Sequence, residues 1–126
     1  MIDATMLAAI NADPALRRWS RHMEADVLLE IGAETWRWVV RDGTLASVTA
    51  GPFVMPAWTV ALRAEPEAWA IFMRPEPTPG YHDLMALVRR GALRVEGDLR
   101  PFMQHLFWFK AVFAKLREPK LQERAA

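Results

Sequence analysis

The segment from Pro101 to Leu116, PFMQHLFWFKAVFAKL, limits the possible folds most, because it is too apolar for an ordinary surface helix. Four of its residues recur at helical spacing and form a complete apolar stripe: Phe102, Leu106, Phe109 and Phe113. We expect this stripe to pack as core against a sheet. Phe107 and Trp108 lie away from the stripe and are candidates for partner contact. We rank a protein partner or self-association ahead of a membrane surface.

The length and composition are those of one small domain. We expect residues 1–126 to form a single domain, with a polar, frayed tail from about residue 118. The absence of cysteine excludes disulfides and thiolate metal sites, and a net charge of +1 gives no general attraction to nucleic acid. No apolar run has the ~18 residues of a membrane span, and the N-terminus does not resemble a secretory signal. We therefore expect a cytoplasmic protein without an integral membrane segment.

Alternating apolar residues predict four strands in the first half of the chain. We place them at 25–32, 34–41, 44–50 and 57–64 and interpret them as a meander. Asp42-Gly43 is typical of a hairpin turn, because both of its residues tolerate positive φ. In the fourth strand we expect Trp58, Val60 and Leu62 to share one face.

Helical spacing and capping residues account for most of the remainder. We predict helices at 14–23, 66–73, 81–91 and 101–116, a looser helical turn at 6–10, and a fifth strand at 92–97. Asp13 and Asp98 are expected to cap the helices that follow them, and Gly91 to end the helix before it. The resulting order is α-β-β-β-β-α-α-β-α, an α+β fold.

The segment YHDLMALVRRGALRVEGDLRPFMQHL, with this element order, resembles the sterol carrier protein 2 family. The family pattern is a helix, a small-residue turn, a strand and a second helix, matched here by Gly91, Leu93, Val95, Gly97 and Asp98. The resemblance spans roughly residues 20–117, including the first hairpin. It implies a five-stranded mixed, mostly antiparallel sheet covered by helices, with an apolar pocket for lipids or fatty acyl chains.

Large apolar side chains are the candidates for lining this pocket between the sheet and the C-terminal helix. They are Trp36, Trp38, Trp58, Met85, Phe102, Met103, Leu106, Phe109 and Phe113. Tryptophan rings suit a slot for a flat or chain-like ligand, and methionine repacks easily around an irregular one. Ordinary core packing is the alternative role for the same residues. Gln104 and His105 are candidates for orienting the polar head of the ligand.

Catalytic patterns are not apparent in the sequence. His22, His82 and His105 lie in different segments, without metal-ligand spacing, and neither serine lies in a glycine-rich elbow. We therefore expect no catalytic residues, cofactor or metal, and predict a carrier of a sterol, fatty acid or fatty acyl-CoA. One alternative is an interaction subunit, as a homodimer or on a larger enzyme. The other is a small α+β enzyme with a buried His/Asp dyad.

Overall fold

Five strands form one mixed sheet in the order β3-β2-β1-β4-β5. The computed structural model describes residues 2–118 and gives the strands as β1 (Ala25–Ile31), β2 (Glu34–Arg41), β3 (Thr44–Ala50), β4 (Val60–Ala64) and β5 (Leu93–Gly97). β4 pairs parallel to β1, and the other pairs are antiparallel. The predicted α+β class and mixed five-stranded sheet are confirmed. The predicted four-strand meander is wrong for β4, which lies on the other side of β1 from β2.

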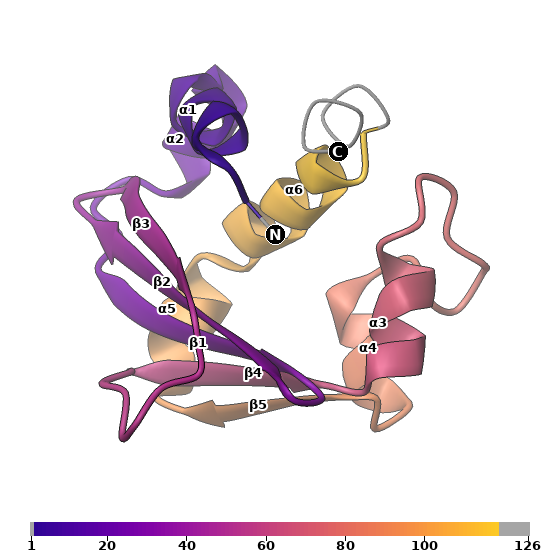
Figure 1. Ribbon diagram of the computed structural model, residues 1–126. Helices are drawn as coiled ribbons and strands as arrows, with labels where there is room; N and C mark the ends of the chain where they lie inside the picture. Colours follow the sequence, from indigo (N-terminus) through magenta and orange to yellow (C-terminus); the bar gives the residue numbers. More distant parts are fainter. Residues whose placement is uncertain (1, 119–126) are drawn as a thin grey trace.

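The helices gather on the concave face of this curved sheet (Figure 1). They are α1 (Ala4–Ala12), α2 (Pro14–Trp19), α3 (Pro66–Phe72), α4 (Leu84–Arg89), α5 (Leu99–Gln104) and α6 (Leu106–Leu116). In Figure 1, α6 lies between α1 and α2 on one side and α3 and α4 on the other. Asp13 and Asp98 cap α2 and α5 as predicted, because their carboxylates accept backbone N–H bonds. The predicted tail beyond residue 118 lies outside the described residues.

The single predicted helix over 101–116 is wrong, because the chain breaks it at His105. His105 has φ −115° and ψ 28°, which ends α5 and starts α6 in a new register. The buried face of α6 then consists of Trp108, Phe109, Val112, Phe113 and Leu116. The predicted exposed pair is therefore only half correct, since Phe107 is 66% exposed but Trp108 is 1% exposed.

Aromatic side chains fill the space between the sheet and α6. The Trp38 ring packs edge-on against Trp108 at 6.4 Å between centroids, and in a tilted arrangement against Phe113 at 5.4 Å. Both contacts are in the range of favourable aromatic pairs. Trp69 of α3 also contacts Phe113, at 5.0 Å. This part of the interior is thus packed with the protein's own rings.

Trp58 does not share a face with Val60 and Leu62, contrary to the sequence prediction. β4 begins only at Val60, and the preceding loop folds over the outer face of the sheet. There the Trp58 ring lies 5.8 Å from the guanidinium of Arg63 and beside Leu28. Side chains alternate between the two faces of a sheet only within a strand, so the alternation of β4 does not place Trp58, which lies in the loop before it.

Candidate ligand pocket

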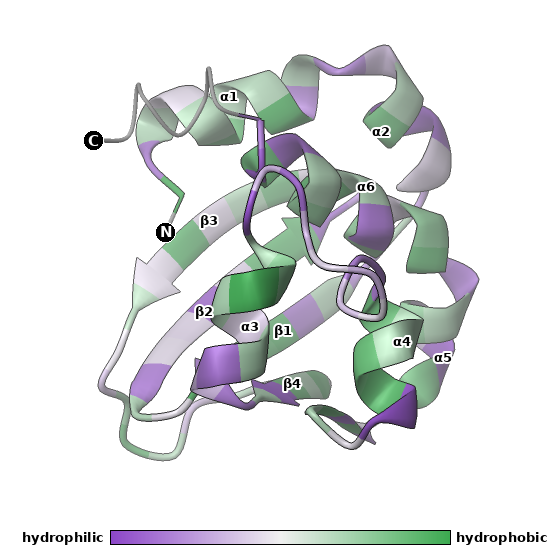
Figure 2. Cartoon of the chain, turned by 90° about the vertical axis from the view of Figure 1, so that its right-hand side faces the viewer, coloured by the Kyte–Doolittle hydropathy of each residue, from purple (hydrophilic) through white to green (hydrophobic). Residues whose placement is uncertain are grey.

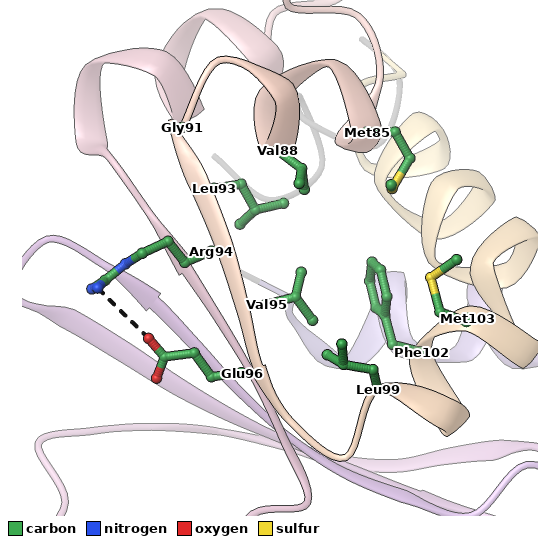
Figure 3. Close-up of a pocket in the computed structure, with 10 residues that line it drawn as sticks. All are labelled: Met85, Val88, Gly91, Leu93, Arg94, Val95, Glu96, Leu99, Phe102 and Met103. Carbon is green, nitrogen blue, oxygen red and sulfur yellow. Dashed lines mark ion pairs between the residues drawn. The ribbon is translucent and has the colours of Figure 1, made fainter.

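A cavity of about 490 Å³ opens between β5, α4 and α5 (Figure 3). Apolar side chains from all three elements form its wall: Met85, Val88, Leu93, Val95, Leu99, Phe102 and Met103. Figure 3 shows these side chains directed toward a common space. Figure 2 colours most of α4 as hydrophobic, although this helix is short and lies near the surface. The wall is therefore apolar on every element that contributes to it.

Two glycines at the ends of β5 make this geometry possible. Gly91 (φ 72°) follows α4 and turns the chain into β5, while Gly97 (φ 94°) turns it from β5 into α5. A Cβ on Gly97 would lie 2.5 Å from the carbonyl oxygen of Thr59, so a larger residue does not fit. Asp98 then accepts a hydrogen bond from the N–H of Arg100 and starts α5. The segment from Gly91 to Asp98 thereby places β5 between α4 and α5, which face each other across the cavity.

Charged groups stand only at the outer rim of the pocket. Arg94 pairs with Glu96 at 3.7 Å, and Glu96 also accepts a 3.0 Å bond from Nε of Arg63. Arg63 also donates to Glu30, and these hydrogen bonds and charges, that of Glu96 first, raise the pKa of Arg63. Glu96 is therefore part of an ion-pair network on the outer face of the sheet.

Solved structures of sterol carrier proteins superpose on nearly the whole chain. A crystal structure of sterol carrier protein 2 matches at a TM-score of 0.73 and 13% identity, covering 90% of this chain and 91% of that one. The chain has the sterol carrier protein 2 fold. A conserved hypothetical protein from Thermus thermophilus, described as possibly a sterol carrier protein, matches at 0.63 and 13% identity, with coverages of 92% and 89%.

The ubiquinone synthesis protein UbiJ-SCP2 matches this sterol carrier protein 2 fold at a TM-score of 0.57 and 19% identity, with coverages of 91% and 90%. No model of a known protein family matches the sequence. No curated protein matches it significantly either. The predicted resemblance is thus confirmed as a likeness of fold.

The sterol carrier protein 2 fold brings only some of the predicted ligand residues to the pocket. Met85, Phe102 and Met103 line it. Trp38, Phe109 and Phe113 lie instead in the aromatic core under the sheet. The other three predicted ligand residues do not line the pocket either. Trp36 and Leu106 are half-buried, and Trp58 lies on the outer face of the sheet.

Four wall residues were not assigned to a site from the sequence. They are Val88, Leu93, Val95 and Leu99. Leu93 and Val95 carried a usable signal, because their alternation on β5 already placed them on one face. The contribution of α4 and α5 depends on how two helices pack at the edge strand, which no local pattern encodes.

The predicted head-group candidates do not line the pocket. Gln104 is exposed, and Nδ1 of His105 lies 3.1 Å from the carbonyl oxygen of Trp19, in hydrogen-bond contact. Arg94 is the one cation among the lining residues, and its side chain points away from the apolar wall, toward Glu96 (Figure 3). On β2, the indole nitrogens of Trp36 and Trp38 are buried and have no hydrogen-bond partner among the described residues.

The arrangement offers binding chemistry more clearly than reaction chemistry. Within residues 2–118, no three His, Asp or Glu side chains gather as metal ligands would. Nδ1 of His82 accepts a bond from the N–H of Gly80, and His22 faces Asp42 at 3.6 Å in full solvent. None of these contacts is the buried His/Asp dyad that the enzyme alternative assumes.

Across the same described residues, no helix is long and apolar enough to pass through a bilayer.

Proposed function

We propose that this chain is a lipid-binding domain that holds the apolar part of its ligand between β5, α4 and α5. The observation that carries the proposal is an open cavity of about 490 Å³ with an apolar wall, in a fold shared with sterol carrier proteins. Pockets for small ligands have volumes of ~300–1,000 Å³ and few polar groups, a description that this one fits. Met85, Phe102 and Met103 are the predicted ligand contacts that the proposal keeps.

The size of the apolar wall is compatible with reversible binding. A sterol or acyl chain that buries about 400 Å² of apolar surface gains about 10 kcal/mol at ~25 cal/mol/Å². Association costs of about 4 kcal/mol or more reduce this gain to ~6 kcal/mol or less. The result corresponds to a dissociation constant of tens of micromolar or weaker, which permits release. These values suit a non-catalytic carrier that acquires and releases its cargo.

Among ligand classes, the proposal retains a sterol, a fatty acid or a fatty acyl-CoA. The apolar body would lie against Val88, Val95 and Phe102, and a polar head would emerge at the open side of the cavity. Head-group recognition by Gln104 or His105 is not kept, because neither lines the cavity. A cytoplasmic location stays a prediction from the sequence.

A pair of matched substitutions tests this pocket. Val88→Trp places an indole in the cavity wall, whereas Val54→Trp makes the same change at a fully exposed loop residue. We expect Val88→Trp to weaken binding of a fluorescent fatty acid at least about tenfold, since it occupies the volume that the ligand needs. Val54→Trp should bind like the parent. Native mass spectrometry before and after organic extraction should detect a small apolar mass on the parent.

The proposal is wrong if the parent binds neither the fatty acid nor a sterol probe and carries no extractable mass. Equal affinities of the two tryptophan variants would likewise place the ligand elsewhere. Circular dichroism of both variants separates loss of ligand from loss of fold.

An interaction subunit is the second candidate, and one observation favours it. Phe107 is 66% exposed beside the exposed ring of Trp19. Such a subunit should change its oligomeric state on Phe107→Ser, measured by analytical ultracentrifugation, with no response to lipid probes. Trp108 does not suit this test, because its ring is buried.

A further inference from the structure

The strand β5 is the last in the sheet, and one of its two sides is open (Figure 1). The strand order ends β1-β4-β5, and within residues 2–118 no further strand pairs with β5. An open strand edge presents unpaired N–H and C=O groups to any chain that can add a strand. β5 therefore offers a backbone template to a partner.

The bonds at the two ends of β5 show which of its residues face the open side. The N–H of Asp98 donates to the residue before β4, and the C=O of Ala92 accepts from the residue after β4. Backbone groups of an antiparallel strand point alternately toward the neighbouring strand and away from it. Ala92 and Asp98 point toward β4, and the register between them is unbroken. The residues that point to the open side are therefore Leu93, Val95 and Gly97.

The opposite edge of the sheet, at β3, is protected. The side-chain amide of Asn11 bonds both the N–H and the C=O of Leu45 on that strand. An irregularity also shifts the register of β2 with β3 between Val39 and Val40. Covering an edge and bulging it are both common means of blocking further strand pairing. The register of β5 with β4, in contrast, is regular over residues 93–97.

Exposed apolar side chains lie beside the open side of β5. Leu99 and Met103 of α5 are 46% and 53% exposed, and both line the ligand pocket. The pocket is also lined by β5 residues of both faces, since Val95 points into it whereas Arg94 points the other way (Figure 3). The cavity therefore reaches the backbone of β5 at its open side. A partner on this edge would cover apolar surface as well as pair a strand.

We propose that β5 pairs antiparallel with β5 of a second copy of this chain, about a two-fold axis at Val95. The sequence LRVEG places Arg94 and Glu96 on either side of Val95. In the paired strands, Arg94 of each copy therefore stands opposite Glu96 of the other. The residues that point to the open side also meet one another, because Val95 faces its own counterpart and Leu93 faces Gly97. The edge thereby matches itself in both charge and hydrogen bonding.

Charge also selects this register over its neighbours. The nearest alternatives that keep the open-side groups opposite one another place Arg94 opposite Arg94, or Glu96 opposite Glu96. Like charges directly opposite each other destabilise a strand pair. The self-complementary charges favour a second copy over an unrelated peptide as the occupant of this edge.

Both charges are available to the second copy. Arg94 contacts Glu96 of its own chain at 3.7 Å, and the Arg94 side chain is 70% exposed. Exposed ion pairs of this kind contribute little to stability. Arg63 bonds Oε2 of Glu96 at 3.0 Å, which holds the carboxylate in place and leaves Oε1 with only the longer contact to Arg94. An opposite charge from the second copy therefore adds to contacts that are weak within one chain.

The pairing would also close the ligand pocket, and this step alone rests on the proposed function. Because α4 precedes β5 and α5 follows it, antiparallel pairing sets α5 of one copy beside α4 of the other, on the same face of the joined sheets. Leu99 and Met103 are then covered by the second copy. The open sides of the two cavities face each other, so that each copy completes the enclosure of the other.

Charge reversal at β5 tests the dimer. We expect the parent to form a reversible dimer in sedimentation velocity over a range of concentrations. Arg94→Glu and Glu96→Arg should each raise the dissociation constant of the dimer at least about tenfold, because both facing pairs then join like charges. Arg18→Glu makes the same charge change at an exposed residue of α2 and should dimerise like the parent.

A mixture of the two charge variants gives the sharpest result. When Arg94→Glu meets Glu96→Arg, every facing pair again joins unlike charges, so the mixture should associate about as well as the parent. This recovery cannot come from misfolded chains, and circular dichroism checks each variant separately. Failure of the mixture to associate, with both variants folded, would refute the proposed register.

Hydrogen exchange measured by NMR locates the contact. The N–H groups of Leu93 and Val95 should exchange slowly when the parent is concentrated and faster when it is diluted, because only the second copy protects them. The N–H of Glu96 faces β4 and should stay protected at both concentrations. Protection of Val95 that does not depend on concentration would contradict the pairing.

Other outcomes overturn the inference without touching the proposed function. A parent that stays monomeric at all concentrations refutes the dimer, even if it binds the fatty acid. A dimer that both charge reversals leave intact but Phe107→Ser disrupts would place the interface on α6. Sedimentation is measured without lipid, so a β5 dimer that binds no fatty acid would show that only the pocket assignment is wrong.

Discussion

Substitution of two neighbouring aromatic residues tests the break at His105 that sets the register of α6. Phe107 and Trp108 are adjacent in sequence, but Phe107 is 66% exposed to solvent and Trp108 only 1%. We expect Trp108→Ala to lower the free energy of unfolding by about 3–5 kcal/mol, as large buried aromatics do. Phe107→Ala should change it by no more than about 0.5 kcal/mol, as exposed positions do.

Contacts in the core explain the size of the expected difference. The indole of Trp108 packs edge-on against Trp38 at 6.4 Å and against Phe109 at 5.1 Å. Each aromatic pair contributes about 0.5–1.5 kcal/mol beyond the area that it buries, and the cavity left behind adds to the loss. A domain of this size has a free energy of unfolding of about 5–15 kcal/mol, so Trp108→Ala removes a large share of it.

Urea unfolding followed by far-ultraviolet circular dichroism measures both variants without relying on the altered tryptophan. With an m value of about 2 kcal/mol/M, the midpoint for Trp108→Ala should fall by about 2 M. Similar losses in the two variants, or a larger loss for Phe107→Ala, would refute the broken helix. Such a result would restore one continuous helix with Trp108 in solvent.

Three further substitutions test how the rest of the fold is held. Asn11→Ala should cost about 1–3 kcal/mol in urea unfolding, because the Asn11 amide bonds both the N–H and the C=O of Leu45, joining α1 to β3. Gly97→Ala should cost more than about 1 kcal/mol and weaken ligand binding, since φ 94° admits only glycine without strain; wild-type stability would contradict this. Lys115 donates a 3.1 Å hydrogen bond to Asp13, and this bond lowers the pKa of the Asp13 carboxyl. The pair therefore stabilises the fold at pH values above the unfolded pKa of ~4, and this stabilisation is lost as pH falls through the lower folded pKa. In acid titrations of stability, Asp13→Asn should therefore show a shallower decline than the parent, and an identical decline would exclude this pair as a cause.

Local signals predicted the elements well, because each depends on a few neighbouring residues. The Asp42-Gly43 turn has positive φ at both residues, and Gly91 ends its helix in the left-handed region, as expected. Asp98 caps the helix after β5. The five pattern residues of the family resemblance, Gly91, Leu93, Val95, Gly97 and Asp98, therefore frame the pocket, although none of them was predicted to contact a ligand.

Helical spacing gave a wrong prediction for the C-terminal segment, because it assumed one unbroken helix there. A pattern of 100° per residue grouped Leu106 with Phe102 and left Trp108 outside. One non-helical residue, His105, turns Trp108 inward and keeps the ring centroids of Phe102 and Phe109 5.0 Å apart. Nothing in the composition of the segment marks this break, since histidine is an ordinary helix residue.

The amino-acid sequence by itself determined the α+β class, the turns and caps, and the surplus of large apolar side chains near the C-terminus. Those features depend on backbone preferences and on side chains within a few residues of each other. Only the tertiary structure decided that β4 lies beside β1, that the tryptophans of β2 meet a packed core or its margin, and that the cavity opens at β5. These outcomes depend on which distant surfaces bury each other, and several arrangements of the same apolar residues satisfy the local pattern equally well.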